Sequence, residues 1–266
     1  MRRPVVGLLS DFGLKDPYVA EMKAVISSIC EDAQIIDISH GIEKFDVRMG
    51  AFVLASTVPY FPKDAVYVAV VDPGVGTKRR PIVVETKHSL LVGPDNGLLI
   101  LAAEKDRVKH VYEIRNTALM LPRVSTIFHG RDVFAPVAAY LAMGRLPYEV
   151  GSEIDDYLIP KYAKPAVEGG TLTGEVLHID DFGNIITNIS AKDLNKIDAE
   201  KDASLLVKLG RKFLSLRYCS AYGEVAVNGL LAVIGGHGFL EIAINQGNAA
   251  SKLKARVGMN MQIVKA

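Results

Sequence analysis

The sequence predicts an α/β protein in which a mainly parallel sheet is followed by a smaller all-β domain. Strand and helix patterns alternate up to about residue 145, which is typical of a parallel sheet with helices on both faces. Residues 151–170 then have the composition of a linker, and beyond them short strands separated by turn residues favour a barrel or a sandwich. We therefore expect an N-terminal α/β domain at 1–155, a linker at 156–170 and a C-terminal β domain at 171–266.

The first elements are a strand, a turn and a helix. Val5–Ser10 is a short apolar strand that ends in Ser-Asp-Phe-Gly, so Asp11 is expected at a strand tip. Asp16 and Pro17 have the pattern of a helix N-cap followed by proline at the first helical position, and this helix continues to about Cys30. The next elements are the strand Ala33–Ile38 and the helix Val47–Val58.

The strand Ala65–Val71 leads to the most informative turn of the chain. It is apolar throughout and stops at Asp72, which is followed by Pro73, Gly74 and Gly76 and then by three cations. The N-terminal domain is completed by the strands Pro81–Glu85 and Leu90–Val92, a short helix after the turn 93–99, the strand His110–Ile114 and the helix His129–Gly144.

In the C-terminal domain, Gly174–Asp181 alternates between polar and apolar residues, as a half-buried strand does. Residues 204–216 predict a hairpin that turns at Gly210-Arg211. Leu230–Ile234 and Phe239–Ile244 are expected to pair around a glycine-rich turn.

Composition limits the function. The 266 residues are 49% apolar, enough for a large core, and 31 Lys and Arg balance 30 Asp and Glu. This balance argues against a nucleic-acid or membrane-surface binder, which carries a basic excess. The two cysteines are far apart, and no apolar run reaches spanning length, so we expect a cytoplasmic protein.

The common catalytic signatures are missing from the sequence. It contains no GxGxxG, GxxxxGK[ST], HExxH or GxSxG motif and no Cys/His cluster with metal-ligand spacing. These absences weaken the dehydrogenase, P-loop, zinc protease and serine hydrolase hypotheses together.

Asp11, Asp72 and His129 are each expected at a strand tip or a helix start, and in a parallel sheet these edges lie on one side. An aspartate beside an arginine, such as Asp72 near Arg79, stays ionised and orients a water, and a nearby imidazole takes or relays its proton. A second aspartate is a natural acceptor for the two hydroxyls of a ribose.

Each of these features also has a structural interpretation. Asp72 before Pro-Gly is a turn former, the cations 78–80 form a solvated face, and residues 180–184 fit a hairpin turn. From the residues alone we therefore predict only an α/β enzyme or binder of a polar, ribose-containing ligand.

Five motifs in order resemble one family, the S-adenosyl-L-methionine (SAM) hydroxide adenosyltransferases, which are related to fluorinase and chlorinase. They are SDFG with DPYVAEMKAVI, VVDPGVGTKRRPIVVE, PDNGLL, STIFHGRDVFAP and HIDDFGNIITNI. The resemblance implies hydrolysis of SAM to adenosine and L-methionine. It implies no metal, because the sulfonium leaves as a neutral thioether, and no cofactor, because SAM is the substrate. It also implies an N-terminal α/β domain with a C-terminal β-barrel, and a homotrimer that holds the ligand between the N-terminal domain of one subunit and the C-terminal domain of the next.

The resemblance also assigns residues. It implies that Asp72, Arg79 and His129 activate the water and that Asp11 grips the ribose diol. Lys78 and Arg80 are left as solvated neighbours. In the C-terminal domain it places Asp180 at the methionine end, Asn184 at the adenine edge, and Phe182 and Tyr222 beside the purine. Where relatives often carry Asn-Ser before the LEIA segment, this chain has Gly235-Gly236-His237, so backbone amides or His237 are the alternatives for that contact.

Two further functions stay open at this stage. One is a halogenase that uses chloride or fluoride as the nucleophile, although the halogenating relatives lack the Asp-Arg-His set. The other is a non-catalytic sensor of SAM or adenosine, because binding would use most of the same residues.

Overall fold

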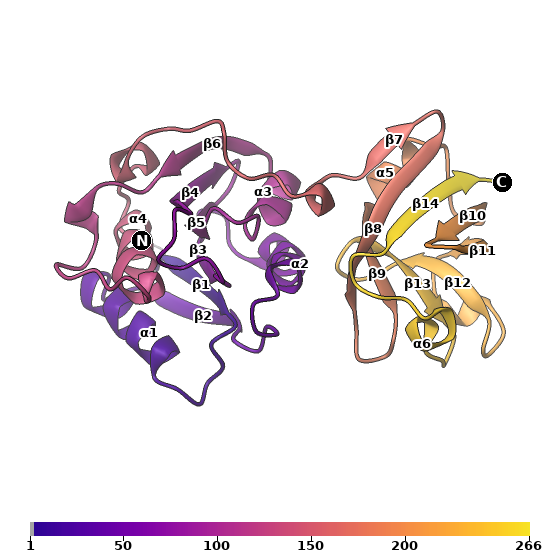
Figure 1. Ribbon diagram of the computed structural model, residues 1–266, viewed down its shortest axis with the longest axis horizontal. Helices are drawn as coiled ribbons and strands as arrows, with labels where there is room; N and C mark the ends of the chain where they lie inside the picture. The colour runs from indigo at the N-terminus through magenta and orange to yellow at the C-terminus, as the bar shows by residue number, and fades with distance from the viewer. Residues whose placement is uncertain (1–2) are drawn as a thin grey trace. The chain divides into compact units, whose positions relative to one another are not determined.

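A computed structural model describes residues 3–266. The chain divides between Ile159 and Pro160 into two units (Figure 1). The expected linker, 156–170, straddles this division. Its later part is ordered: Lys161–Ala163 is a 3₁₀ turn, and β7 (Ala166–Glu168) pairs with the strand that follows it.

The first unit is built on a six-stranded sheet in the order β2-β1-β3-β5-β4-β6. The strands β1, β2, β3 and β5 are parallel, and β4 runs antiparallel to both β5 and β6. This confirms the expected α/β class with a mainly parallel sheet. The bounds are β1 Val5–Ser10, β2 Gln34–Ser39, β3 Val66–Val70, β4 Pro81–Thr86, β5 Leu90–Pro94 and β6 Val108–Glu113.

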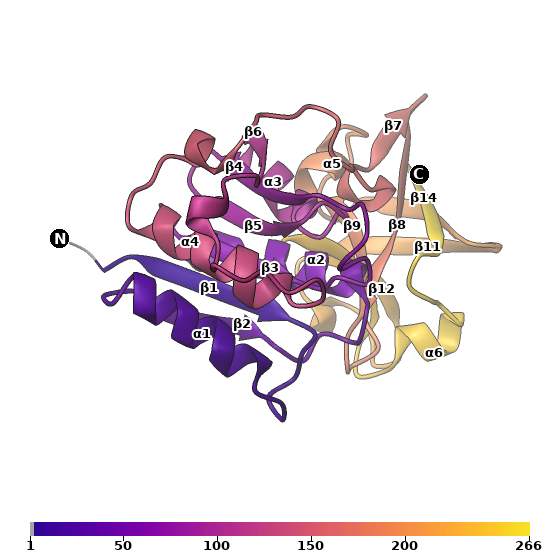
Figure 2. The same ribbon diagram turned by 60° about the vertical axis from the view of Figure 1, so that its left-hand side comes forward.

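Helices cover both faces of this sheet, with α1 and α4 on one face and α2 and α3 on the other (Figures 1 and 2). Alternate strand residues Val6, Leu8 and Val68 pack in one core with Met22 and Ile26 of α1. Burial on both faces explains why the central strands are continuously apolar rather than alternating. The bounds are α1 Tyr18–Ile29, α2 Val47–Thr57, α3 Ile100–Asp106 and α4 Ala135–Ala142.

Two helix predictions differ from the structure. The first helix begins at Tyr18, with Pro17 as its N-cap residue and no side-chain cap, so Asp16 does not cap it. The helix expected at 129–144 is interrupted, because Gly130–Phe134 forms a π-helical turn before α4 begins. Pro136 has no N–H to donate to the carbonyl of Asp132, which accepts from the N–H of Leu121 instead.

The second unit is a closed barrel. Its strands follow the order β14-β10-β11-β12-β13-β9-β8, and pairing of β14 with β8 closes the ring. The expected hairpin turns at Gly210, whose φ is +58°, and the barrel is the all-β fold that the C-terminal sequence favoured. The bounds are β8 Thr171–Ile179, β9 Ile185–Ser190, β10 Ser204–Leu209, β11 Lys212–Cys219, β12 Leu230–Ile234, β13 Phe239–Ile244 and β14 Asn260–Lys265, with short helices α5 Ala191–Asn195 and α6 Ala249–Leu253.

The remaining turns are short 3₁₀ segments at Val58–Tyr60, Thr117–Leu119, Pro147–Val150 and Tyr222–Glu224. Among residues 3–266, no helix has the length and apolar character needed to span a membrane.

Candidate active site

Two aspartates follow neighbouring parallel strands at the same edge of the sheet. Ser10, the last residue of β1, lies opposite Val70, the last residue of β3. Asp11 directly follows Ser10, and Asp72 lies two residues beyond Val70, so the parallel register brings both to the carboxyl edge where α/β proteins bind ligands. Asp11 is 6% exposed, and the side chain of Asp72 is 5% exposed.

Asp72, Arg79 and His129 form one hydrogen-bonded group. Arg79 Nε and Nη2 both donate to Asp72 Oδ2, at 2.8 and 2.5 Å, and Arg79 Nη2 also donates to His129 Nδ1 at 2.9 Å. The guanidinium lies over the ring of the fully buried Phe134, with its carbon 5.3 Å from the ring centroid. The structure therefore brings together the three residues that the resemblance singled out.

The hydrogen bonds determine where the protons lie. Because a guanidinium only donates, Nδ1 of His129 must accept, and the neutral ring carries its proton on Nε2. Burial, and then the positive charge of Arg79, hold the pKa of His129 below its ordinary value. The imidazole is consequently neutral near pH 7.

Two polar atoms of this group are buried without a hydrogen-bond partner among the described residues. They are Asp72 Oδ1 and Arg79 Nη1. Buried polar atoms are normally paired, so such atoms in a native site indicate a place for a water or a ligand. The group therefore offers one free acceptor on a carboxylate and one free donor on a guanidinium.

The turn between Asp72 and Arg79 holds their relative position. The N–H of Val75 donates to the carbonyl of Asp72 at 3.3 Å, and Thr77 Oγ1 donates to the carbonyl of Gly74 at 2.7 Å. Gly76 has φ +76°, and a Cβ there would lie 2.7 Å from the carbonyl oxygen of Thr126. The left-handed conformation and this close approach both require glycine.

Of the other two cations beside this turn, Arg80 is not the solvated neighbour that was expected. Its guanidinium donates to Asp95 Oδ2 at 2.8 Å and to Asp156 Oδ1 at 2.6 Å. Residue 156 is far away in sequence, so only the fold could reveal this cross-link. Lys78 remains exposed, as expected.

Asp11 is fixed separately from that group. Its Oδ2 accepts from the N–H of Phe45 at 2.9 Å, and its carbonyl accepts from Lys44 Nζ. No hydrogen bond joins Asp11 to Asp72, Arg79 or His129 in the part of the chain that the structure describes.

Sequence reasoning missed two groups that support these residues. Ser10 Oγ and His40 Nδ1 are 2.7 Å apart and buried, and His40 Nε2 lies 3.1 Å from Asp37 Oδ1. Behind His129, Asp132 is fully buried and accepts from the N–H of Ser125 at 2.7 Å. In the sequence Ser10 precedes Asp11 and Asp132 lies three residues after His129, but no pattern pairs Ser10 with His40.

In the second unit, Asp180 organises the turn that leads into β9. Its Oδ1 accepts from the N–H groups of Phe182 and Asn184, at 3.0 and 2.8 Å, and its Oδ2 accepts from Asn184 Nδ2 at 3.0 Å. Asn184 is buried, whereas Phe182 is 80% exposed. Gly183 has φ +82°, and a Cβ there would lie 2.1 Å from Asn248. The structural interpretation of 180–184 as a turn is therefore correct, and the turn presents an aromatic ring to solvent.

Tyr222 lies in the 3₁₀ turn after β11 and is 41% exposed. Its Oη donates to Oε2 of the buried Glu241 at 2.6 Å. Burial, then Glu241, then the charge of Asp180 raise the pKa of the Tyr222 phenol above its ordinary value. Asp180 is therefore close enough to Tyr222 to act on it electrostatically, which brings these two expected residues to one region of the barrel.

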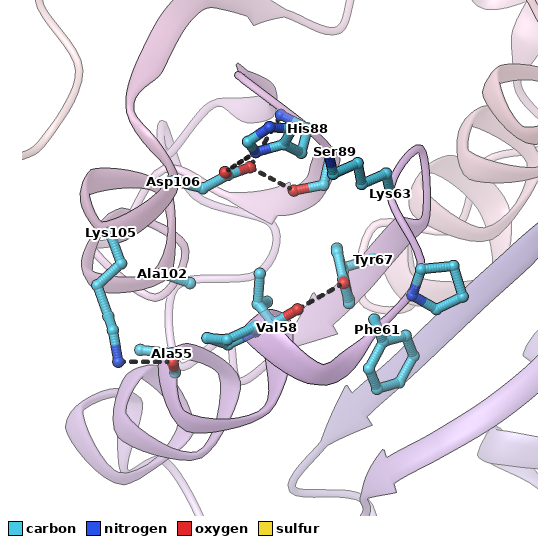
Figure 3. Close-up of a pocket in the computed structure, with 12 residues that line it drawn as sticks. Ala55, Val58, Phe61, Lys63, Tyr67, His88, Ser89, Ala102, Lys105 and Asp106 are labelled. Atoms are coloured by element: carbon cyan, nitrogen blue, oxygen red, sulfur yellow. Dashed lines mark hydrogen bonds and ion pairs between the residues drawn. The ribbon is translucent and has the colours of Figure 1, made fainter. Parts of the chain in front are cut away.

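A cavity of about 300 Å³ lies elsewhere in the first unit, between α2, α3 and the beginning of β3 (Figure 3). Three of its polar side chains bind one another: Asp106 Oδ1 lies 2.7 Å from His88 Nδ1, and Asp106 Oδ2 accepts from Ser89 Oγ at 3.1 Å. These bonds close the turn between β4 and β5, so we interpret this polar group as structural. Among residues 3–266, no group of three or more His, Cys, Asp or Glu side chains is arranged to hold a metal ion.

Comparisons with known proteins identify the family. The models of the SAM hydroxide adenosyltransferase N-terminal and C-terminal domains match residues 6–151 and 174–262. An (R)-S-adenosyl-L-methionine hydrolase from Salinispora arenicola is 38% identical over 98% of this chain and 97% of its own length. The crystal structure of an uncharacterized conserved protein from Thermotoga maritima is 42% identical, with a TM-score of 0.85 over 97% of this chain and 99% of that one.

A fluorinase from Actinoplanes sp. is more distant, at 27% identity over 99% of this chain and 98% of its own length. Both domain models and the full-length hydrolase relative thus agree with the five motifs. The chain belongs to the SAM hydroxide adenosyltransferase family.

Proposed function

We propose that this protein hydrolyses SAM to adenosine and L-methionine. The observation that carries the proposal is Asp72, a buried carboxylate whose Oδ2 is held by Arg79 while Oδ1 has no partner among the described residues. An ionised carboxylate with one free, buried oxygen is suited to bind and orient a water. The Salinispora relative, named as a hydrolase of SAM, supports the choice of substrate.

The reaction needs one displacement. The oxygen of water forms a bond to ribose C5′ as the bond from C5′ to the sulfonium sulfur breaks, and the electron pair of that bond neutralises sulfur. The leaving group is a neutral thioether, which needs no acid. The water proton passes to Asp72 Oδ1. We propose that the reaction uses no metal and no cofactor.

Most of the rate enhancement is expected from positioning. Holding a water in line behind C5′ is worth about 7–11 kcal/mol in well-oriented systems. General-base assistance by Asp72 adds a factor of about 10²–10⁴.

Within this proposal, His129 supports Arg79 rather than taking the first proton. Its Nδ1 already accepts from Arg79, and its lowered pKa keeps the ring neutral. The imidazole therefore orients the guanidinium, which in turn fixes Asp72, and its Nε2–H is left as a donor toward the site.

The remaining residues are proposed to bind the substrate. Asp11 would accept from the ribose hydroxyls through Oδ1, since Oδ2 is engaged by Phe45. In the barrel, Asp180 would meet the methionine end and Asn184 the adenine edge, with the rings of Phe182 and Tyr222 beside the purine. We further propose that the protein is a cytoplasmic homotrimer in which each ligand is shared between the N-terminal domain of one subunit and the C-terminal domain of the next.

A halide nucleophile fits this group less well. A chloride or fluoride ion beside Asp72 would be repelled by a like charge, whereas a water accepts hydrogen bonds and gives up a proton there. The fluorinase relative is also less similar in sequence to this chain than the hydrolase relative is, which agrees with hydrolysis.

One experiment tests hydrolysis against its two alternatives. The protein is incubated with SAM in ¹⁸O-labelled water, with and without chloride or fluoride, and the nucleoside is identified by mass spectrometry. We expect adenosine that carries one ¹⁸O on its 5′ oxygen under all conditions. A 5′-halo-adenosine would replace the proposal with halogenation, and intact SAM with measurable binding would replace it with a sensor.

A further inference from the structure

A chain of three polar side chains is centred on Glu241, a residue of β13 that is 4% exposed. Its Oε2 accepts from Tyr222 Oη at 2.6 Å, and its Oε1 lies 2.9 Å from His237 Nε2, a close contact whose angle is outside hydrogen-bond geometry. The three residues come from separate parts of the sequence: the turn after β11, the turn between β12 and β13, and β13 itself. None of these bonds follows from the motifs of the family.

The state of His237 is defined by its neighbours. Its Nδ1 accepts from the N–H of Phe239 at 3.1 Å, so the proton of the neutral ring is on Nε2 and faces Glu241. Both ring nitrogens are thereby in contact with neighbouring groups of this unit. His237 therefore has no ring nitrogen left for a ligand, and it does not replace the Asn-Ser pair of the relatives by direct contact.

Gly235 makes this arrangement sterically feasible. A Cβ at this position would lie 1.8 Å from Glu241 Oε1 and 2.8 Å from His237 Nε2. Any side chain at position 235 would therefore separate the carboxylate of Glu241 from the imidazole of His237. The departure from Asn-Ser to Gly-Gly-His is thus linked to the buried contact between His237 and Glu241.

The charge of Glu241 is not balanced by a lysine or arginine within residues 3–266; its partners are a phenol and an imidazole. The hydrogen bond from Tyr222 is strong, because its acceptor is a carboxylate in a dry environment, and the His237 ring lies against the other oxygen of the same carboxylate. The bond to Glu241 therefore fixes the direction of Tyr222, whose half-exposed ring is close enough to Asp180 for the charge of Asp180 to raise its pKa.

We propose that Glu241 and His237 are positioning residues that hold the Tyr222 ring as a wall for the purine of the ligand. The proposal rests on the proposed function, because it takes Tyr222 to face the adenosyl group. Glu241 fixes the phenol, and His237 fixes Glu241. Their effect is expected on the binding of the adenosyl group, not on attack by water at the other half of the site.

The test compares Tyr222→Phe, His237→Ala and the double variant with the parent. Binding of adenosine is measured by calorimetry, and KM and kcat for SAM are measured separately. Both single changes should weaken adenosine binding and raise KM while kcat stays near the parental value. For Tyr222→Phe the change should be about tenfold, the effect of one hydrogen bond to a charged group. Because the residues act through one chain, the double variant should bind adenosine with the same affinity as the single variant that binds it less tightly.

His237→Gln is the rescue variant, since its amide oxygen can accept from Phe239 while its NH₂ donates to Glu241. It should restore binding close to the parental value, whereas a loss caused only by misfolding would not be rescued in this way. His110→Ala, which changes an exposed histidine paired with Glu153 in the first unit, is the matched control and should leave binding unchanged.

Additive losses in the double variant, or unchanged adenosine affinity in His237→Ala, would overturn the inference. Failure of the proposed function is distinguishable, because the parent protein itself would then produce no adenosine from SAM. The tautomer gives an independent readout. The ¹⁵N signals of His237 should show a protonated Nε2 in the parent, and a protonated Nδ1 would contradict the chain.

Discussion

Replacing Asp72 by asparagine should separate the chemistry of this site from its binding. The change keeps the size of the side chain and one hydrogen-bond acceptor for Arg79, but it removes the negative charge. Without that charge the water loses its base, so kcat should fall by a factor of about 10²–10⁴. Binding of 5′-deoxyadenosine should change little, because it lacks the 5′ oxygen that comes from the attacking water.

The same substitution should also lower the free energy of unfolding, and the size of the loss depends on how deeply the pair of Asp72 and Arg79 is buried. The side chains of Arg79 and Asp72 are only 8% and 5% exposed, so the guanidinium would remain buried beside a neutral amide. Removing one partner of a buried ion pair costs about 3–5 kcal/mol. The contact of Arg79 with Phe134 and the retained acceptor place the expected loss toward the lower end, about 3 kcal/mol, measurable by urea unfolding.

Asp95→Asn is the matched control. Asp95 is also a buried partner of an arginine, at 2.8 Å from Arg80, but it belongs to the cross-link toward Asp156. The Asp95→Asn variant should be less stable than the parent while its kcat remains near the parental value. The reasoning would be refuted if Asp72→Asn turned over at the parental rate, or if Asp95→Asn lost as much kcat as Asp72→Asn.

Three further outcomes are expected. Gly76→Ala should lower stability by about 1–3 kcal/mol, because the residue needs a positive φ and its Cβ would meet the carbonyl of Thr126; an unchanged thermal midpoint would contradict this. The pKa of His129 is lower in the folded than in the unfolded protein, so the unfolded state binds more protons between the two values and stability should fall as the pH drops below about 6.5. In His129→Gln this part of the pH dependence should be missing when urea midpoints at neutral and acidic pH are compared. If the parent and His129→Gln had identical pH profiles of stability, the lowered pKa of His129 would be excluded as the cause. Ser10→Ala should cost about 1–3 kcal/mol by leaving His40 Nδ1 buried without its partner, and unfolding at the parental urea concentration would argue against that bond.

The sequence alone determined the class of the fold and one edge of the site. Apolar strands buried on both faces, helices with an apolar stripe and glycine turns are local patterns, so β1, β3 and the two strands β12 and β13 were predicted within one or two residues. The pair of Asp72 and Arg79 was also accessible, because both residues belong to one tight turn. The five motifs carried the family, which the comparisons then confirmed.

Only the tertiary structure decided which partner each polar group takes. Arg80 pairs with Asp156, and His129 accepts from Arg79 across fifty residues of sequence. Glu241 could not be singled out in the pattern FLEIAI. Because β13 is buried on both faces, the sequence pattern does not show which face of the strand Glu241 is on or which residues it contacts. Periodicity specifies which residues are buried, but the partner of a buried charge depends on register and on loops that come together only when the chain has folded.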